Sequence, residues 1–442
     1  MKEPSQPTAS PAIIKPSPAP ESAGSTNELL LAATQGDREA QYKLAQSCEQ
    51  GPASPTNKVE AARWYRKAAE QGYAQAQFKL GTFLHAGDAG LSKNDTEAVS
   101  WFRMAAEQGC IEAEFALGGC YGRGDGVPRD VPAAMQWIRK AADKGLARAQ
   151  YLTGRAYQNG AGVERNPEQA VAWYRKAAEN GSADGQLWLG LAFLNGQGTN
   201  QDFQAATNWI YKAIRAGSAT AQYQLGMLQI KGDRLPSNPA EGMHRLLEAA
   251  RQDNADAQYQ VSMFYMKGDS VAQDDAEAFR WCRKAAEEGS PVAEEALAGL
   301  YRSGKGVEKN LDESILWLRR AAELGNASAQ FKLGLSCAMG EGVPQNTSEA
   351  VRWFRLAAQQ GSTEGQNSLG YAYATGTGVA QDLAEAYKWY TLAVADGNMH
   401  AELNLRNLLP RLTEAQIAAG KARAALFSPE SVDGNLSRAE FQ

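Results

Sequence analysis

Apolar and small residues recur along most of the chain at the three- and four-residue spacing of amphipathic helices. One stretch reads AQYLTGRAYQNGAGVERNPEQAVAWYRKAAENG, from 149 to 181. Ala149, Leu152 and Ala156 share a helical face in its first half, and a second such face contains Trp173. The pattern predicts two helices joined by a glycine-containing loop.

This helix–loop–helix pattern repeats along the chain. Tryptophan occurs at 64, 101, 137, 173, 209, 281, 317, 353 and 389, and every interval is 36 apart from one of 37 and one of 72. A fixed period of this length is typical of a solenoid, because a single unit cannot bury its apolar face alone. We therefore predict an all-α fold, a right-handed α-solenoid (superhelix) of about ten helix-loop-helix repeats with terminal capping helices.

Each second helix has a start signal and a stop signal. An Asn or Asp precedes it in all ten units, at Asn57, Asn94, Asp130, Asn166, Asp202, Asn238, Asp274, Asn310, Asn346 and Asp382. Glu or Gln follows three residues later in eight of them, the exceptions being Ala133 and Ala205, so we expect capping boxes. A glycine such as Gly181 ends the helix.

The repeat boundaries divide the chain into five segments. Residues 1–26 contain six prolines and almost nothing to bury, so we expect a disordered tail. The other four are an N-terminal half-repeat cap at 27–36, ten units at 37–400, a C-terminal half-repeat with a capping helix at 401–428, and a flexible tail at 429–442. Thr413 and Gln416 are expected to begin that capping helix with a capping box.

The repeated motif AxxxLGxxYxxGxGVxxDxxxAxxWYRKAAEQGxAxAQ resembles the Sel-one-like repeat (SLR) family, which is related to the tetratricopeptide repeat. LGGCYGRGDGVPRD at 117–130 and YRKAAENGSADGQ at 174–186 are examples. The resemblance implies a tetratricopeptide-like solenoid. It also implies a role like those of family members, which act as adaptor scaffolds in degradation, signalling, secretion, envelope assembly and host contact.

Charge and composition exclude several other classes of protein. A formal net charge of −5 gives no broad attraction to nucleic acid or to anionic membranes. No apolar run is long enough to span a bilayer, so we expect a cytoplasmic protein if Met1 is the native start, or a periplasmic or secreted one if a signal peptide was removed. The five cysteines include no CxxC pair and are expected to be free thiols.

No motif predicts catalysis, and we expect a protein without enzyme activity, catalytic residues, metal or cofactor. Lys305 lies in the sequence RSGKGV, but no Ser or Thr follows it, and other units replace it with Asp, Ala, Gln, Glu or Thr between the same two glycines. A phosphate-binding loop would keep the lysine, so we interpret these glycines as turn residues. Arg234 and Ser270 replace the second glycine in two units.

A row of residues on the first helices of units four to seven predicts a binding surface. Positions three, six and ten after the leading small residue share one helical face, which we expect to be concave. The predicted partner-binding residues are Arg155, Trp188, Leu191, Asn195, Gln224, Met227, Lys231, Gln260, Met263 and Lys267. Apolar and Met side chains rimmed by polar groups suit a peptide, although the middle position could instead be half buried between units.

The preferred interpretation is a non-enzymatic, bacterial scaffold or adaptor, a monomer that binds a protein or peptide on its concave surface. One alternative is an immunity protein that masks a secreted toxin. Another is a hydrolase acting on cell-wall fragments or β-lactams, an activity implied only by the resemblance. An envelope-attached assembly factor is a third possibility.

Overall fold

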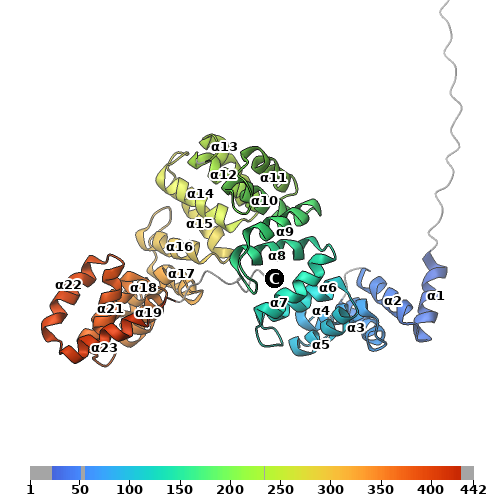
Figure 1. Ribbon diagram of the computed structural model, residues 1–442, viewed down its shortest axis with the longest axis horizontal. Coiled ribbons are helices and arrows are strands. Elements are labelled where there is room, and N and C mark those ends of the chain that lie inside the picture. Colours follow the sequence, from blue (N-terminus) through green and yellow to red (C-terminus); the bar gives the residue numbers. More distant parts are fainter. Residues whose placement is uncertain (1–21, 51–54, 233, 430–442) are drawn as a thin grey trace, which may run out of the picture. The chain divides into compact units, whose positions relative to one another are not determined.

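The computed structural model describes residues 22–50, 55–232 and 234–429. Over these residues it contains 23 α-helices, one 3-10 helix and no strand (Figure 1). The chain divides between residues 156 and 157 into two compact units of structure. In both, successive antiparallel helices pack against each other, which confirms the predicted all-α solenoid.

Each repeat contributes two helices, and in the nine repeats other than the one formed by α8 and α9 these helices contact each other more extensively than they contact the next repeat. The first helices are α2 (Arg38–Gln50), α4 (Ala74–Ala86), α6 (Ile111–Arg123), α8 (Ala147–Asn159), α10 (Ala183–Asn195), α12 (Ala219–Lys231), α14 (Ala255–Lys267), α16 (Pro291–Ser303), α18 (Ala327–Met339) and α20 (Thr363–Thr375). The second helices are α3 (Pro55–Glu70), α5 (Asp95–Glu107), α7 (Val131–Asp143), α9 (Pro167–Glu179), α11 (Phe203–Arg215), α13 (Pro239–Arg251), α15 (Asp275–Glu287), α17 (Leu311–Glu323), α19 (Thr347–Gln359) and α21 (Leu383–Ala395).

Nine of the ten predicted N-caps are confirmed. In each, the side-chain oxygen accepts a hydrogen bond from the backbone N–H three residues later, as the Asn166 amide does from Gln169 at 2.9 Å. The prediction for Asn57 was wrong, because α3 begins at Pro55 and contains it. Proline fits the first turn of a helix, where its missing N–H is not needed.

The other half of the expected capping box is replaced by a main-chain bond. The N–H of Asn166 donates to the carbonyl oxygen of Tyr157 in the preceding helix at 2.8 Å, so it has no need of a side-chain acceptor. The side chain of the glutamate at the third position is then available for other hydrogen bonds and ion pairs. In α19, Glu349 accepts from the indole N–H of Trp353 and pairs with Arg319 of the preceding unit, each at 3.4 Å.

The paired glycines are turn residues, as the sequence indicated. Gly304 ends α16 with a φ of 74°, and Gly306 has a φ of 67°. A side chain on Gly306 would collide with the carbonyl oxygen of Asp275 at the start of the preceding second helix. The loop thus turns the chain and touches the previous unit, while Lys305 remains exposed to solvent.

The closest contact within a unit joins a helical glycine to the residue that follows the tryptophan position. A Cβ built on Gly334 would lie 2.6 Å from the ring of Phe354, so only glycine allows the ring this approach. The residues that follow the tryptophan position are all buried: Tyr65, Phe102, Ile138, Tyr174, Ile210, Leu246, Cys282, Leu318, Phe354 and Tyr390.

The tryptophans of the repeat are less buried than the residues that follow them. Trp173, Trp317 and Trp389 are buried, whereas the other six tryptophans of the 36-residue repeat are half exposed. A cation from the same helix covers most of these rings, as Lys176 covers Trp173 with its ammonium 4.0 Å from the ring centroid. The space between units is therefore filled by leucines such as Leu333 and by the residue after the tryptophan.

The two ends of the array differ in part from the prediction. Helix α1 (Ser22–Thr34) begins inside the segment 1–26 that we assigned to a tail, where no further proline follows Pro20. The rest of that segment, 1–21, lies outside the described residues, as do 430–442 of the C-terminal tail. Helix α22 (Met399–Leu408) and the 3-10 turn η1 (Leu409–Arg411) lead to α23 (Glu414–Ala425).

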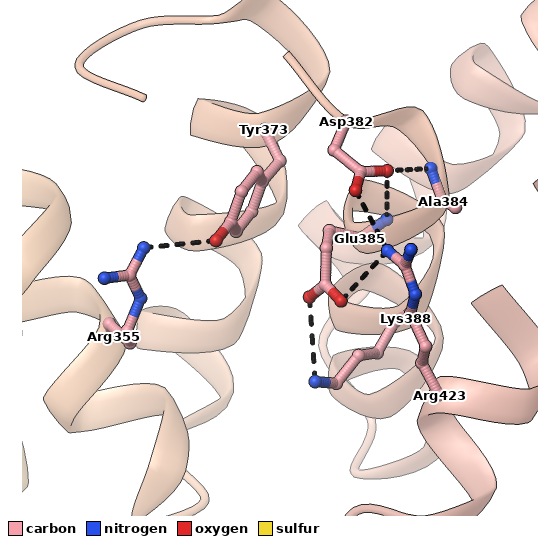
Figure 2. A network of polar contacts seen from close by, with 7 residues as sticks. All are labelled: Arg355, Tyr373, Asp382, Ala384, Glu385, Lys388 and Arg423. Carbon is pink, nitrogen blue, oxygen red and sulfur yellow. Dashed lines mark hydrogen bonds and ion pairs between the residues drawn. The ribbon is translucent and has the colours of Figure 1, made fainter. Parts of the chain in front are cut away.

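Helix α23 begins with the predicted Thr413–Gln416 capping box and packs against α21. Arg423 donates to Asp382 at 2.9 Å and to Glu385 at 3.1 Å, so one guanidinium serves both carboxylates (Figure 2). These contacts, together with the Trp389–Phe427 ring pair at 5.3 Å, fix the C-terminal cap on the last second helix.

In seven of the ten units, a glutamine near the start of the first helix joins the unit to the helix before it. Gln330 of α18 donates to the carbonyl oxygen of Ala322 in α17 at 3.1 Å and accepts from Gln360 at 2.8 Å. Gln41, Gln77, Gln150, Gln186, Gln258 and Gln366 make the same bond to a carbonyl eight residues earlier. The glutamine thus adds a second hydrogen bond to a carbonyl at the end of a helix, which already accepts from a main-chain N–H such as that of Gly325.

Glu294 occupies this glutamine position in α16, and we expect Glu294→Gln to stabilise the protein. The carboxyl is buried, so desolvation raises its pKa above 4.5, against the attraction of Arg320 at 3.0 Å. A raised carboxyl pKa favours the folded state below pH 4.5 and loses that contribution as the pH rises and the group ionises. Glutamine can instead donate to Ala286, which is worth about 1 kcal/mol.

Urea denaturation of both proteins from pH 4 to pH 8 tests this expectation, with the exposed substitution Gln204→Ala as a control. The gain for Glu294→Gln should grow as the pH rises. A stability equal to or below that of the wild type at pH 8 would contradict it.

Candidate partner-binding site

A cavity of about 270 Å³ opens beside Trp188, where α9 and α10 meet the C-terminal end of α8. Leu191 and Asn195, on the next turns of α10, line it as well, so three of the predicted partner-binding residues lie in one cavity. Val171 of α9 adds apolar surface. All of these residues belong to the second compact unit.

Two stacked aromatic rings form one wall of this cavity. The ring centroids of Tyr174 and Trp188 are 6.2 Å apart with an interplanar angle of 30°. Tyr174 is buried, and its hydroxyl donates to the Gln158 side chain at 2.5 Å, which fixes the ring in place. Trp188 is half buried, so part of its indole remains accessible to an apolar group of a ligand.

Polar side chains surround this aromatic wall. The amides of Asn159, Asn195 and Gln197 line the cavity, and amides can both donate to and accept from the main chain of a bound segment. The charged groups at its edge are Arg165, which donates to the carbonyl of Gln158 at 3.1 Å, and Glu168. The combination suits an apolar side chain flanked by peptide groups better than a free charged ligand.

The predicted residues of α12 and α14 lie outside this cavity. Gln224, Met227, Gln260 and Met263 are half buried, whereas the lysines that end the two helices, Lys231 and Lys267, are exposed. Met227 packs against the core around Leu246, and Leu191 against the core around Ile210. The middle position of the row therefore contributes to packing between helices, and only part of each side chain is available to a partner.

Arg155 belongs to the first compact unit, unlike the other nine predicted residues. It lies on α8 and is half buried, and its guanidinium donates to the hydroxyl of Tyr151 at 3.0 Å. This hydrogen bond gives Arg155 a role within its own helix, and its part in partner binding stays a prediction.

The sequence reasoning missed the cavity residues that come from outside the first helices. Tyr174, Arg165, Glu168 and Gln197 line the cavity but were not among the predicted partner-binding residues. A comparison of units could have found the site. Only the fifth unit has tryptophan at the third position of the row, and the helix before it carries the aromatic Tyr174.

Arg234 links the cavity to an irregular loop. It replaces the second glycine of its unit and keeps the left-handed backbone, with a φ of 64°, and its guanidinium donates to the Asn195 side chain. Ser270 is also left-handed, with a φ of 64°. Residues other than glycine are strained in this conformation, because their Cβ approaches the following carbonyl oxygen. The breaks in the glycine pattern are therefore strained, and one of them holds a side chain of the cavity.

The cysteines are free but poorly disposed to act as nucleophiles. Cys110, Cys120, Cys282 and Cys337 are buried, and Cys48 is half buried. Burial raises the pKa of the Cys120 thiol to about 11 and that of Cys282 to about 12, so both are thiols at neutral pH. Within the described ranges, no three His, Cys, Asp or Glu side chains are grouped as metal ligands.

None of the helices described here is both long and apolar enough to cross a membrane.

Three histidines occur in the chain, and His85 of α4 lies 2.6 Å from Asp95 through Nδ1 and 3.5 Å from Arg123 through Nε2. These contacts join α4, α5 and α6 within the first compact unit, so the imidazole of His85 has a structural role.

Comparison with protein families gives a match over most of the chain. A model of the Sel1 repeat matches ten consecutive segments: residues 38–73, 74–110, 111–146, 147–182, 183–218, 219–254, 255–290, 291–326, 327–362 and 363–398. These segments begin and end within a few residues of the helix pairs described above. No curated protein matches the sequence.

Two solved structures resemble the whole array. The c5321 protein, a protective antigen of uropathogenic Escherichia coli strains with an SLR fold, is 33% identical over 91% of this chain and 86% of its own, with a TM-score of 0.54. A Sel1 repeat protein from Oxalobacter formigenes is 30% identical over 81% of this chain and 95% of its own, with a TM-score of 0.52. The immunity protein Pa5087 from Pseudomonas aeruginosa, at 19% identity over 58% of this chain and 82% of its own, has a TM-score of only 0.29 and adds no argument about function.

The strained loop residues yield a stability prediction. Ser270→Gly and Arg234→Gly should each raise the free energy of unfolding by about 1 kcal/mol, because glycine adopts the left-handed conformation without a side-chain clash. Urea denaturation measures the change. Ser303→Gly, at the helical end of α16, is the matched control and should be destabilising. Equal effects at Ser270 and Ser303 would contradict the assignment of strain.

The burial of the cysteines predicts their reactivity. With the native protein at pH 8, we expect Ellman's reagent to react first with Cys48, the half-buried thiol, while the four buried thiols react only after unfolding in urea. Cys48→Ser should remove the fast phase. A fast phase that survives this substitution would show that one of the buried thiols is accessible.

Proposed function

This chain belongs to the Sel1 repeat family, and we propose that it is an interaction scaffold that binds a segment of a partner protein beside Trp188. Sel1-repeat proteins are typically protein-interaction scaffolds, which gives the class of function. The place of binding rests on one observation, the cavity of about 270 Å³ walled by Tyr174 and Trp188.

The chemistry of the cavity defines the segment that it would accept. One apolar or aromatic side chain of the partner inserts against the half-exposed indole of Trp188, and the amides of Asn159 and Asn195 bind the flanking peptide groups. Such a buried aromatic anchor surrounded by polar groups is the usual arrangement of an interface hot spot.

The remaining residues of the row extend the proposed surface over α12 and α14. The accessible parts of Met227 and Met263 provide adaptable apolar contacts, which suit a segment without a fixed side-chain pattern. The exposed ammonium groups of Lys231 and Lys267 favour acidic residues in the part of the partner that follows the anchor.

A displayed library of random peptides tests this proposal with the full chain as bait. Peptides selected by the wild type should be enriched in an apolar or aromatic residue. Replacing Trp188 by Glu should weaken a selected peptide at least about 30-fold, the loss of one hot spot of ~2 kcal/mol. Fluorescence anisotropy of the labelled peptide measures the change.

Two controls make the result specific. Leu316→Glu places the same charge at an exposed leucine of α17 and should leave the affinity unchanged. Circular dichroism of the Trp188→Glu variant should match the wild type. If selected peptides bind this folded variant as tightly as they bind the wild type, the cavity beside Trp188 is not the binding site.

A further inference from the structure

The two ends of the array are halves of one repeat. Helix α1, with the sequence ELLLAATQG at 28–36, corresponds to a second helix, and α22 corresponds to a first helix. Each packs against its sequence neighbour, α2 and α21 respectively, through the smaller contact that joins adjacent units. Among the described helices, neither therefore has the partner with which helices of its type make their most extensive contact.

The missing partner leaves one face of α22 open. Leu403 is 57% exposed, although residues at its position in the ten complete units are all buried or half buried. Arg406 is exposed at the position of the helical glycine, which is buried in every complete unit. Met399 is 80% exposed, whereas the residues at its position in the second to tenth units, from Ala74 to Thr363, are half buried.

The complete units show what normally covers this face. Phe331, at the position of Leu403, lies 6.0 Å from the ring of Phe354 on the second helix of its unit. Phe78 and Phe102 make the same pair at 5.9 Å. The residue after the tryptophan position of a second helix is thus the group that Leu403 lacks.

Helix α1 presents that group, and among the described helices it has no first helix of its own unit to cover it. Leu29 stands at the position after the tryptophan and is half buried, whereas its ten counterparts are all buried. Ala32 is likewise half buried at a position that is buried in every complete unit. Glu28 takes the place of the tryptophan and is exposed.

We propose that α22 of one molecule packs against α1 of a second copy, so that the two half-repeats complete one further unit between the molecules. Leu403 then contacts Leu29, as Phe331 contacts Phe354 inside the array. The contact joins opposite ends of two molecules, so it is heterologous and generates either a closed ring or an open filament. This assembly replaces the monomer expected from the sequence alone.

Opposite charges on the open faces favour this pairing, and the size of the arginine side chain limits its strength. Arg406 on α22 and Glu28 on α1 are both exposed, and they lie on the two faces that would meet, so their opposite charges attract. Arginine at the glycine position also prevents the closest approach that Gly334 allows to Phe354. We therefore expect reversible, concentration-dependent association.

Helix α23 does not take the vacant place. It packs along α21, where Gly420 lies against the ring of Tyr387 and Arg423 binds Asp382. Among the described helices, none shields Met399 or Leu403 from solvent. The C-terminal cap thus covers the side of the last unit and leaves the end of α22 available to a second copy.

Sedimentation velocity of the full chain over a range of concentrations tests the proposal. The weight-average mass should rise above the 47.6 kDa of one chain as the concentration increases. Leu403→Glu should raise the dissociation constant at least about tenfold, as expected for a charge buried in an interface. Leu356→Glu, at an exposed leucine of α19, is the matched control and should associate like the wild type.

Two further variants distinguish repeat-like packing from non-specific contact. Arg406→Gly should tighten the association by restoring the glycine of a complete unit. Glu28→Arg should weaken it, and combination with Arg406→Glu should restore it. A wild type that stays at 47.6 kDa at every concentration, or association unaffected by Leu403→Glu, would overturn the proposal.

Discussion

The close approach of two helices at a single residue pair determines much of this structure. A helical glycine such as Gly334 removes the Cβ that would block the ring of Phe354, and the same pair of positions is buried in every complete unit. The approach lets the alanines and leucines of both helices pack without gaps. Because each unit has only two helices, its apolar burial comes both from this contact and from its neighbours.

The links between units are mainly polar and satisfy the ends of the helices. A buried glutamine such as Gln330 binds a carbonyl of the preceding helix, and glycine pairs such as Gly304 and Gly306 bring their loop against the start of an earlier helix. The N-cap residue of a second helix bonds at once to its own first turn and, through its N–H, to the preceding helix. These bonds link each of these helices to the one before it through groups at the helix ends.

The proposed binding site is a local change in this regular scaffold. One unit places a tryptophan where the others have smaller or more flexible side chains, and it stacks on the aromatic residue already fixed in the core of the unit before. The scaffold thus orients Trp188 through Tyr174, whose hydroxyl is held by Gln158. The ends of the array are changes of another kind, since Leu403 and Leu29 keep the apolar character of a repeat whose other half is absent.

The sequence alone determined the all-α solenoid, its period, the nine confirmed helix starts and the role of the paired glycines, because these depend on residues close together in the chain. It also selected Trp188, Leu191 and Asn195 together, since helical spacing places them on one face. Only the tertiary structure decided which partner each group takes. The Asn166 N–H bonds to Tyr157 instead of a capping-box side chain, the residue after each tryptophan is the more buried of the two, and Tyr174 joins the cavity from a neighbouring helix. These outcomes depend on competition between groups far apart in sequence, which a local pattern does not contain.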